Sequence, residues 1–249
     1  GEKRFVSKAF RSNVDQFLWG SDSRSIYFLG IWHGQEQVYA LHLDQQSEDD
    51  PTACRVELLT SEVADYGSLA LLGNELICKR HSMSMGDEIY RLGQEEKQLT
   101  HVNQHIYDQV DMGRVEARWQ RTTDGKQMLS WVIYPPHFDP AKKYPVIMYQ
   151  YSGPGSQEVR DAWSIGLYPG AAFESYLADQ GFIVACVDGR GTGARGAAFE
   201  KCTYLKLGEI ESADQVAVAK WLAAQTYVDG ERIGIWGWSF GGFNTLMSM

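Results

Sequence analysis

The sequence predicts an all-β segment over residues 1–107 followed by an α/β segment over residues 108–249. Two patterns predict this division: short strand-like runs repeat through the first segment, and strand-like and helix-like runs alternate through the second. A third observation is the motif G-W-S-F-G-G at 237–242, which directly follows an apolar run and precedes a run able to start a helix. The second segment therefore should contain a parallel sheet with flanking helices.

The first segment contains a degenerate repeat. Residues 17–29 read as strand, polar turn and strand, and residues 37–43 alternate with a period of two. A second copy follows about fifty residues later, at 67–72, 75–79 and 87–92, a spacing typical of four-stranded propeller blades. We therefore predict the C-terminal blades of an incomplete β-propeller over 1–107, with further blades before residue 1. An ordinary antiparallel sandwich or meander is the alternative.

The second segment opens with a predicted hairpin, formed by residues 115–120 and 128–134 around a turn at 123–126. The elements expected after it are a strand at 144–151, a helix at 170–180 closed by Gly181, a strand at 182–187, a helix at 209–224, a turn at 227–230 and a strand at 232–236. This is the order of a parallel sheet with helices on both faces.

The motif at 237–242 is typical of a nucleophile elbow. A strand, G-x-S-x-G and a helix in this order define the nucleophile turn of the α/β-hydrolase fold. Ser239 is then expected in strained backbone geometry, with small residues at 237, 241 and 242 that let neighbouring backbone pass close. Its hydroxyl would stand at a helix N-terminus, where free N–H groups favour a developing oxyanion.

The histidines do not fit a complete catalytic triad. Hydrolases of this fold place Ser first, Asp or Glu second and His last along the chain. All six histidines, at 33, 42, 81, 101, 105 and 137, precede Ser239. We therefore expect a catalytic domain truncated after the elbow, lacking its acid and base, and inactive as a 249-residue chain.

Composition excludes several classes of function. The net charge of −9 and the absence of a basic stripe argue against nucleic-acid binding. No apolar run approaches the ~18 residues of a membrane span. The four cysteines show no C-x-x-C spacing, and Cys186 lies in an apolar run typical of a core strand.

Two further motifs are not expected to bind ligands. Residues 191–196 match G-x-G-x-x-G, but we expect no helix to open there, and no acidic residue ends a strand about twenty positions on. His101 and His105 have the spacing of a helical zinc pair without its glutamate, and we expect them on the surface or packed. No cofactor and no metal are therefore predicted.

The segment Y-S-G-P-G-S-Q at 151–157 ends a predicted strand at the edge where active-site loops belong. The corresponding loop supplies the second oxyanion donor in this fold. Tyr151 is the candidate, the alternative being a tyrosine that only packs.

The motifs at 151–157, 188–193 and 237–242 together resemble the dipeptidyl peptidase branch of the prolyl oligopeptidase family of serine peptidases. The resemblance is strong over 108–249 and weak over 1–107. It implies release of dipeptides from a free N-terminus, with Pro or Ala at the second position. It implies Ser239 as nucleophile, the Tyr151 hydroxyl and the Phe240 N–H as oxyanion donors, and Phe240 and Trp238 as substrate-binding residues. Position 240 is tyrosine in many relatives. Phenylalanine here lacks the tyrosine hydroxyl and therefore any contact that this hydroxyl makes in them.

The resemblance also implies that Asp188 and Arg190 brace their loop, and that two glutamates in the missing propeller bind the substrate's amino group. The expected partners are peptides with a free N-terminus, and the whole protein could be an extracytoplasmic homodimer. The alternatives are an esterase or acyl-peptide hydrolase on the same fold, and a catalytically dead relative that serves as a binding module.

Overall fold

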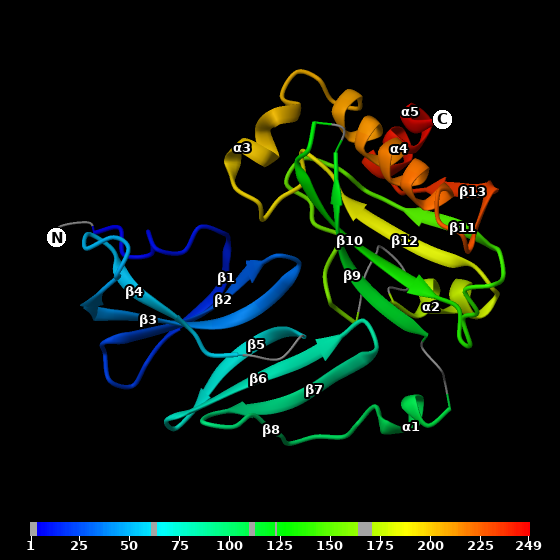
Figure 1. Cartoon of the computed structure of the whole chain (residues 1–249). Coiled ribbons are helices and arrows are strands. Elements are labelled where there is room, and N and C mark those ends of the chain that lie inside the picture. The colour runs from blue at the N-terminus through cyan, green and yellow to red at the C-terminus, as the bar shows by residue number, and fades with distance from the viewer. Residues whose placement is uncertain (1–3, 61–63, 110–112, 123, 164–170) are drawn as a thin grey trace.

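The structure is a computed structural model that describes residues 4–60, 64–109, 113–122, 124–163 and 171–249. Two small antiparallel sheets form one part of the molecule, and a larger sheet with helices forms the other (Figure 1).

The first segment forms two four-stranded sheets. The strands of the first sheet are β1 (Val14–Trp19), β2 (Ser25–Trp32), β3 (Gln35–Gln46) and β4 (Cys54–Leu58). Those of the second are β5 (Asp65–Leu72), β6 (Glu75–Ser82), β7 (Met85–Leu92) and β8 (Lys97–Gln98). Each sheet pairs its strands in chain order, as a propeller blade does. Leu29 and Val38 of the first sheet pack with Tyr66 and Leu69 of the second, so the two share one core.

The larger sheet is mixed. It consists of β9 (Arg114–Arg121), β10 (Gln127–Tyr134), β11 (Tyr144–Tyr149), β12 (Ile183–Asp188) and β13 (Val228–Trp236), in the order β13-β11-β12-β10-β9. Strands β11, β12 and β13 are parallel, whereas β10 is antiparallel to both of its neighbours. The predicted parallel sheet is therefore three strands wide, because the predicted hairpin joins it beside β12.

Helices cover both faces of this sheet, as β12 makes clear. Val184 and Cys186 face a core that includes Ala178 of α2 (Ala171–Asp179). Ile183, Ala185 and Val187 face a core with Val218 and Leu222 of α4 (Glu209–Ala223). The last helix, α5 (Phe240–Ser248), packs against α4 and β13. All six residues of β12 are buried, which agrees with the apolar run at 183–187 that precedes its last residue, Asp188.

Two local expectations needed correction, and a third lies outside the described residues. Strand β13 begins at Val228 and takes in residues predicted as a turn, although its pairing with β11 shifts register between Val228 and Ile233. A one-turn helix, α3 (Ala197–Glu200), opens directly after Gly196, where none was expected, and continues as a 3-10 turn at Lys201–Thr203. The predicted start of α2, residue 170, lies outside the described residues.

The two parts meet around the β6–β7 turn and the loop after β11. Met83, from that turn, packs in the same core as Trp131 and Val159 of the larger part. Gly34, in the β2–β3 turn, approaches Leu129 and the Val159 carbonyl so closely that a Cβ there would collide with both. A four-residue helix, α1 (Gln104–Tyr107), lies on the connection between the two parts.

Candidate active site

Ser239 lies in a sharp turn between β13 and α5. Its backbone has φ 53° and ψ −117°, a combination that non-glycine residues rarely adopt and that is costly unless surrounding structure enforces it. The side chain is exposed at the N-terminus of α5. The geometry is that of a nucleophile elbow.

The glycines of the motif allow this turn. A Cβ at Gly237 would collide with the carbonyl oxygen of Gln150 and the backbone of Gly241. A Cβ at Gly241 would collide with the same carbonyl and lie 3.0 Å from the Tyr151 Cα. The β11 backbone thus passes directly against the elbow, and only glycine fits at these two positions.

Tyr151 and Phe240 come together at the same edge of the sheet. Strands β11 and β13 are parallel neighbours, and the Gln150 N–H donates to the Trp236 carbonyl at 3.1 Å. Residues 151 and 240 therefore follow two adjacent strand ends, and their ring centroids lie 6.3 Å apart. Phe240 is the first residue of α5, so its N–H has no partner within the helix. Trp238 is 63% exposed beside them. Their roles in catalysis stay predictions.

A buried amide network under the elbow was not predicted. Gln150 is fully buried, and its amide nitrogen donates to the Gly241 carbonyl at 2.9 Å and to Thr245 Oγ1 at 3.0 Å. Its amide oxygen accepts from Asn244 at 2.8 Å and from the Ser152 hydroxyl at 2.8 Å. We call Gln150, Ser152, Asn244 and Thr245 the elbow network. The only sequence signal was polar residues at the end of a buried strand and on a packed helix face.

A second amide extends this network to α4. Gln215 Nε2 donates to Ser152 Oγ at 3.0 Å and to the Val187 carbonyl at 3.1 Å. Ser152 itself has φ 60° and is buried. The loop that carries Tyr151 is thus held on both sides, by β11 and by α4.

Asp188 braces the same loop further along. Its buried carboxylate accepts from the Val159 N–H at 2.8 Å and from the Glu158 N–H at 3.1 Å. Burial raises the pKa of Asp188 to about 7, although these two N–H groups oppose the rise. Burial also raises the pKa of Glu158, which accepts from the Tyr149 hydroxyl at 2.9 Å. Burial raises the pKa of Glu174 to about 7.

Arg190 braces the neighbouring loop. Its guanidinium contacts Asp214 of α4 at 2.6 Å and Asp124 at 3.2 Å. Because this hydrogen-bonded pairing occupies the side chain, Arg190 holds the end of β12 to α4 and to the β9–β10 turn. These contacts agree with the bracing roles that the resemblance implies for Asp188 and Arg190.

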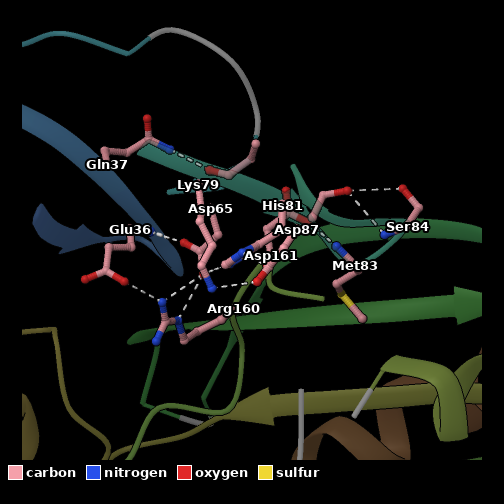
Figure 2. A network of polar contacts seen from close by, with 12 residues as sticks. Glu36, Gln37, Asp65, Lys79, His81, Met83, Ser84, Asp87, Arg160 and Asp161 are labelled. Atoms are coloured by element: carbon pink, nitrogen blue, oxygen red, sulfur yellow. Dashed lines mark hydrogen bonds and ion pairs between the residues drawn. The ribbon is translucent and has the colours of Figure 1, made fainter. Parts of the chain in front are cut away.

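A charged network joins the two parts of the molecule (Figure 2). Arg160, nine residues after Tyr151, contacts Glu36 of β3 and Asp65 of β5, both at 2.9 Å. His81 lies 3.7 Å from Asp65 and 2.8 Å from Asp87. We call Arg160, Glu36, Asp65, His81 and Asp87 the junction network. One arginine therefore links the Tyr151 loop to both small sheets.

The described residues contain no group of three or more side chains suited to hold a metal ion, and His101 and His105 are both exposed. In the part of the chain that the structure describes, no helix has the length and apolar character needed to cross a membrane. The cysteines there are free, and Cys186 is buried in the sheet core.

An exposed serine on a strained strand-to-helix turn, preceded in the chain by two blade-like sheets, is typical of an α/β-hydrolase fold joined to part of a propeller. Comparison with known proteins agrees. Residues 172–249 match the model of the prolyl oligopeptidase family. The resemblance predicted from the motifs and the predicted fold class are thereby confirmed.

Individual relatives match most of the chain. Dipeptidyl-peptidase 5 of Porphyromonas gingivalis is 30% identical over 250 residues, covering 98% of this chain and 34% of that protein. A probable dipeptidyl-aminopeptidase B of Aspergillus fumigatus is 48% identical over 233 residues, covering 90% of this chain and 24% of that protein. The chain thus spans no more than about a third of the length of these relatives.

Solved structures show the same architecture. Porphyromonas gingivalis dipeptidyl peptidase 4 is 33% identical, with a TM-score of 0.75 over 96% of this chain and 33% of that one. Pyrococcus horikoshii acylaminoacyl peptidase gives a TM-score of 0.78 over 98% of this chain and 36% of that one. At 20% identity, the second match shows the fold alone.

Proposed function

We propose that this chain is part of a serine peptidase that releases dipeptides from the N-terminus of peptides, preferring Pro or Ala at the second position. The observation that carries the proposal is the strained elbow of Ser239 beside Tyr151 and Phe240. The printed names of the relatives, dipeptidyl-peptidase and dipeptidyl-aminopeptidase, support this reaction. We further propose the division of the chain into a propeller part, 1–107, and a catalytic part, 108–249.

In the proposed reaction, Ser239 Oγ attacks the carbonyl carbon after the second substrate residue and passes its proton to a base. The Tyr151 hydroxyl and the Phe240 N–H donate to the oxygen that becomes negative. The C–N bond then breaks, the amine leaves with a proton, and water releases the dipeptide from the serine. Because all six histidines precede Ser239, we propose that the 249-residue chain alone is inactive.

We propose that Phe240 and Trp238 bind the substrate side chains. Phe240 offers an apolar wall that suits the compact ring of proline, and Trp238 is exposed next to it. Carboxylates outside these residues would bind the free amino group, as the resemblance implies. The same resemblance supports an extracytoplasmic location and a homodimer for the whole protein.

The test uses an extended protein, meaning one that continues both before Gly1 and beyond Met249 to the length of these relatives. We expect Gly-Pro-anilide to be cleaved with a far higher kcat/KM than acetyl-Gly-Pro-anilide. Acetylation removes the charge that the carboxylates would bind, and analogous losses correspond to roughly 2–5 kcal/mol. Equal values would instead favour an acyl-peptide hydrolase or endopeptidase. No turnover of either compound would favour a catalytically dead binding protein.

The inactivity of the 249-residue chain has its own test. The chain should not hydrolyse Gly-Pro-anilide above background, because a serine without a base is a weak nucleophile. Turnover that disappears in Ser239→Ala would contradict this part of the proposal.

A further inference from the structure

From the geometry of the elbow network we infer that Gln150 is a positioning residue that fixes the Ser239 turn relative to the Tyr151 loop. This inference rests on the proposed function, since it concerns the register of the proposed nucleophile and oxyanion donors. It assigns Gln150, Asn244 and Ser152 a part in catalysis that acts through Ser239 and Tyr151.

The first argument is the saturation of the Gln150 side chain. A glutamine amide offers two donor hydrogens and one acceptor oxygen with two lone pairs. Both donors reach α5, at the Gly241 carbonyl and Thr245 Oγ1, and the oxygen receives one bond from Asn244 and one from Ser152. One planar group therefore fixes α5 and the Tyr151 loop at the same time.

The second argument is sequence distance. Gln150 directly precedes Tyr151, and Gly241 is two residues after Ser239. The bond between Gln150 and Gly241 thus joins segments 91 residues apart, within two residues of each proposed reacting group.

The third argument is energetic. Asn244 is fully buried, and its Oδ1 has no hydrogen-bond partner among the described residues. An unpaired buried oxygen is destabilising, and an apolar pair at 150 and 244 would avoid it. Apolar contacts are not directional, however, and would let α5 rotate or slide against β11. Buried amides that lower stability but fix register are documented elsewhere. The network fits that role.

The decisive variant is Gln150→Met in the extended protein, which keeps the side-chain volume and removes all four hydrogen bonds. We expect kcat for Gly-Pro-anilide to fall about 10- to 100-fold with KM nearly unchanged, because small displacements of reacting groups have effects of that size. The matched control is Gln120→Met. Gln120 is a buried glutamine at the other edge of the same sheet, on β9, and its variant should retain the wild-type kcat.

A double variant separates positioning from stability. Gln150→Met with Asn244→Leu removes the unpaired amide, so its melting temperature should recover relative to the single variant. If Gln150 positions the elbow, kcat stays low in the double variant. If Gln150 only stabilises the fold, kcat recovers together with the melting temperature, and the inference is overturned.

A conservative variant, Gln150→Glu, adds a second measurement, the pH dependence of kcat, which should not change if Gln150 only stabilises the fold. Gln150→Glu keeps the acceptor oxygen and, when protonated, one donor. The ratio of its kcat to that of wild type should therefore rise as the pH is lowered. A ratio independent of pH, or a Gln150→Met variant within twofold of wild type, overturns the inference.

Two further outcomes, a Gln150→Met variant that does not fold and an inactive wild-type protein, can be told apart from failure of the inference. If Gln150→Met does not fold, two milder variants replace it. Ser152→Ala removes the bonds of Ser152 to Gln150 and Gln215, and Thr245→Val removes one bond to Gln150. Each should lower kcat measurably, and unchanged values overturn the inference. If the wild-type extended protein is itself inactive, the proposed function fails, and this is recognised before any variant is compared.

Discussion

The elbow network and the junction network are both polar and each contains a fully buried residue, Gln150 or Asp65, but they are built from different chemistry. The elbow network uses neutral amides and hydroxyls, with Gln150 fully buried. The junction network uses ions: Arg160 with Glu36 and the fully buried Asp65, and His81 between two aspartates. One network supports the elbow, and the other joins the two parts of the molecule.

The difference indicates how each region should respond to solution conditions. Neutral hydrogen bonds do not titrate, so the elbow network itself should be insensitive to pH, whereas Asp188, which braces the same loop further along, titrates. Ion pairs depend on protonation, and breaking a buried pair strands the remaining charge. The contact between the two parts should therefore weaken under conditions that leave the elbow unchanged.

The largest effect is expected on the elbow side. In the extended protein, Tyr151→Phe should lower kcat roughly 10²–10³-fold with little change in KM, because removal of one oxyanion donor has that scale. Steady-state kinetics with Gly-Pro-anilide measure it. A variant within a few-fold of wild type would mean that Tyr151 only packs.

The next effect breaks the junction. Arg160→Met should lower the free energy of unfolding by about 2–4 kcal/mol, because the buried Asp65 carboxylate loses its arginine partner. Urea unfolding of the 249-residue chain measures it. Arg91→Met is the matched control: its pair with Glu75 is exposed, so the expected change is about 0–1 kcal/mol. Equal changes in both variants would show that the Arg160 ion pairs stabilise the chain no more than an exposed ion pair does.

The third prediction concerns pH. Burial lowers the pKa of His81, but contacts with Asp65 and Asp87 outweigh burial and raise it overall. A raised pKa in the folded state means that the stabilisation is present below the unfolded value of 6.5 and is lost as pH rises through the folded value. His81→Gln should therefore destabilise the chain more at pH 6 than at pH 9. Urea unfolding of both proteins at pH 6 and pH 9 measures this. An equal destabilisation by His81→Gln at the two pH values would contradict the prediction.

The buried carboxyls act in the same direction and need a control. The pKa of Asp188 is raised from 3.8 to about 7, so its contribution to stability is greatest at low pH and declines as pH rises toward that value. The free energy of unfolding of the wild-type chain should therefore fall between pH 3.8 and pH 7, and it should fall less in Asp188→Asn. Subtracting the free energy of unfolding of His81→Gln from that of wild type at each pH cancels the contribution of Asp188, which both proteins share.

The smallest effect sharpens the comparison. Thr245→Val removes one neutral bond to Gln150 and should lower the free energy of unfolding by about 0.5–1.5 kcal/mol. Unlike the His81 effect, this change should be equal at pH 6 and pH 9. If the effect of Thr245→Val on the free energy of unfolding depends on pH, the two networks do not differ in the way proposed.

Local signals in the sequence predicted most of the fold. Runs of apolar residues and the G-x-S-x-G motif located β11, β12, α4 and the elbow, because each pattern is short and contiguous. The mixed character of the sheet was not evident, since pairing of β10 with β12 depends on tertiary packing. Both polar networks were missed for the same reason. Arg160 meets Glu36 across 124 residues of sequence, and Gln150 meets Asn244 across 94.

The close passage of β11 against Gly237 and Gly241 has a consequence for how such a turn can diversify. Substitution at either glycine drives a side chain into backbone, so these positions are closed to variation by natural drift or by a randomised library. Two of the positions between them differ in this respect: Trp238 is exposed, and Phe240 is half-buried against the rings of Tyr151 and Phe243. The turn thus combines two positions closed by backbone packing with two whose side chains can change, and these two are the proposed substrate-binding residues. A change of substrate preference at them would leave the backbone of the turn intact.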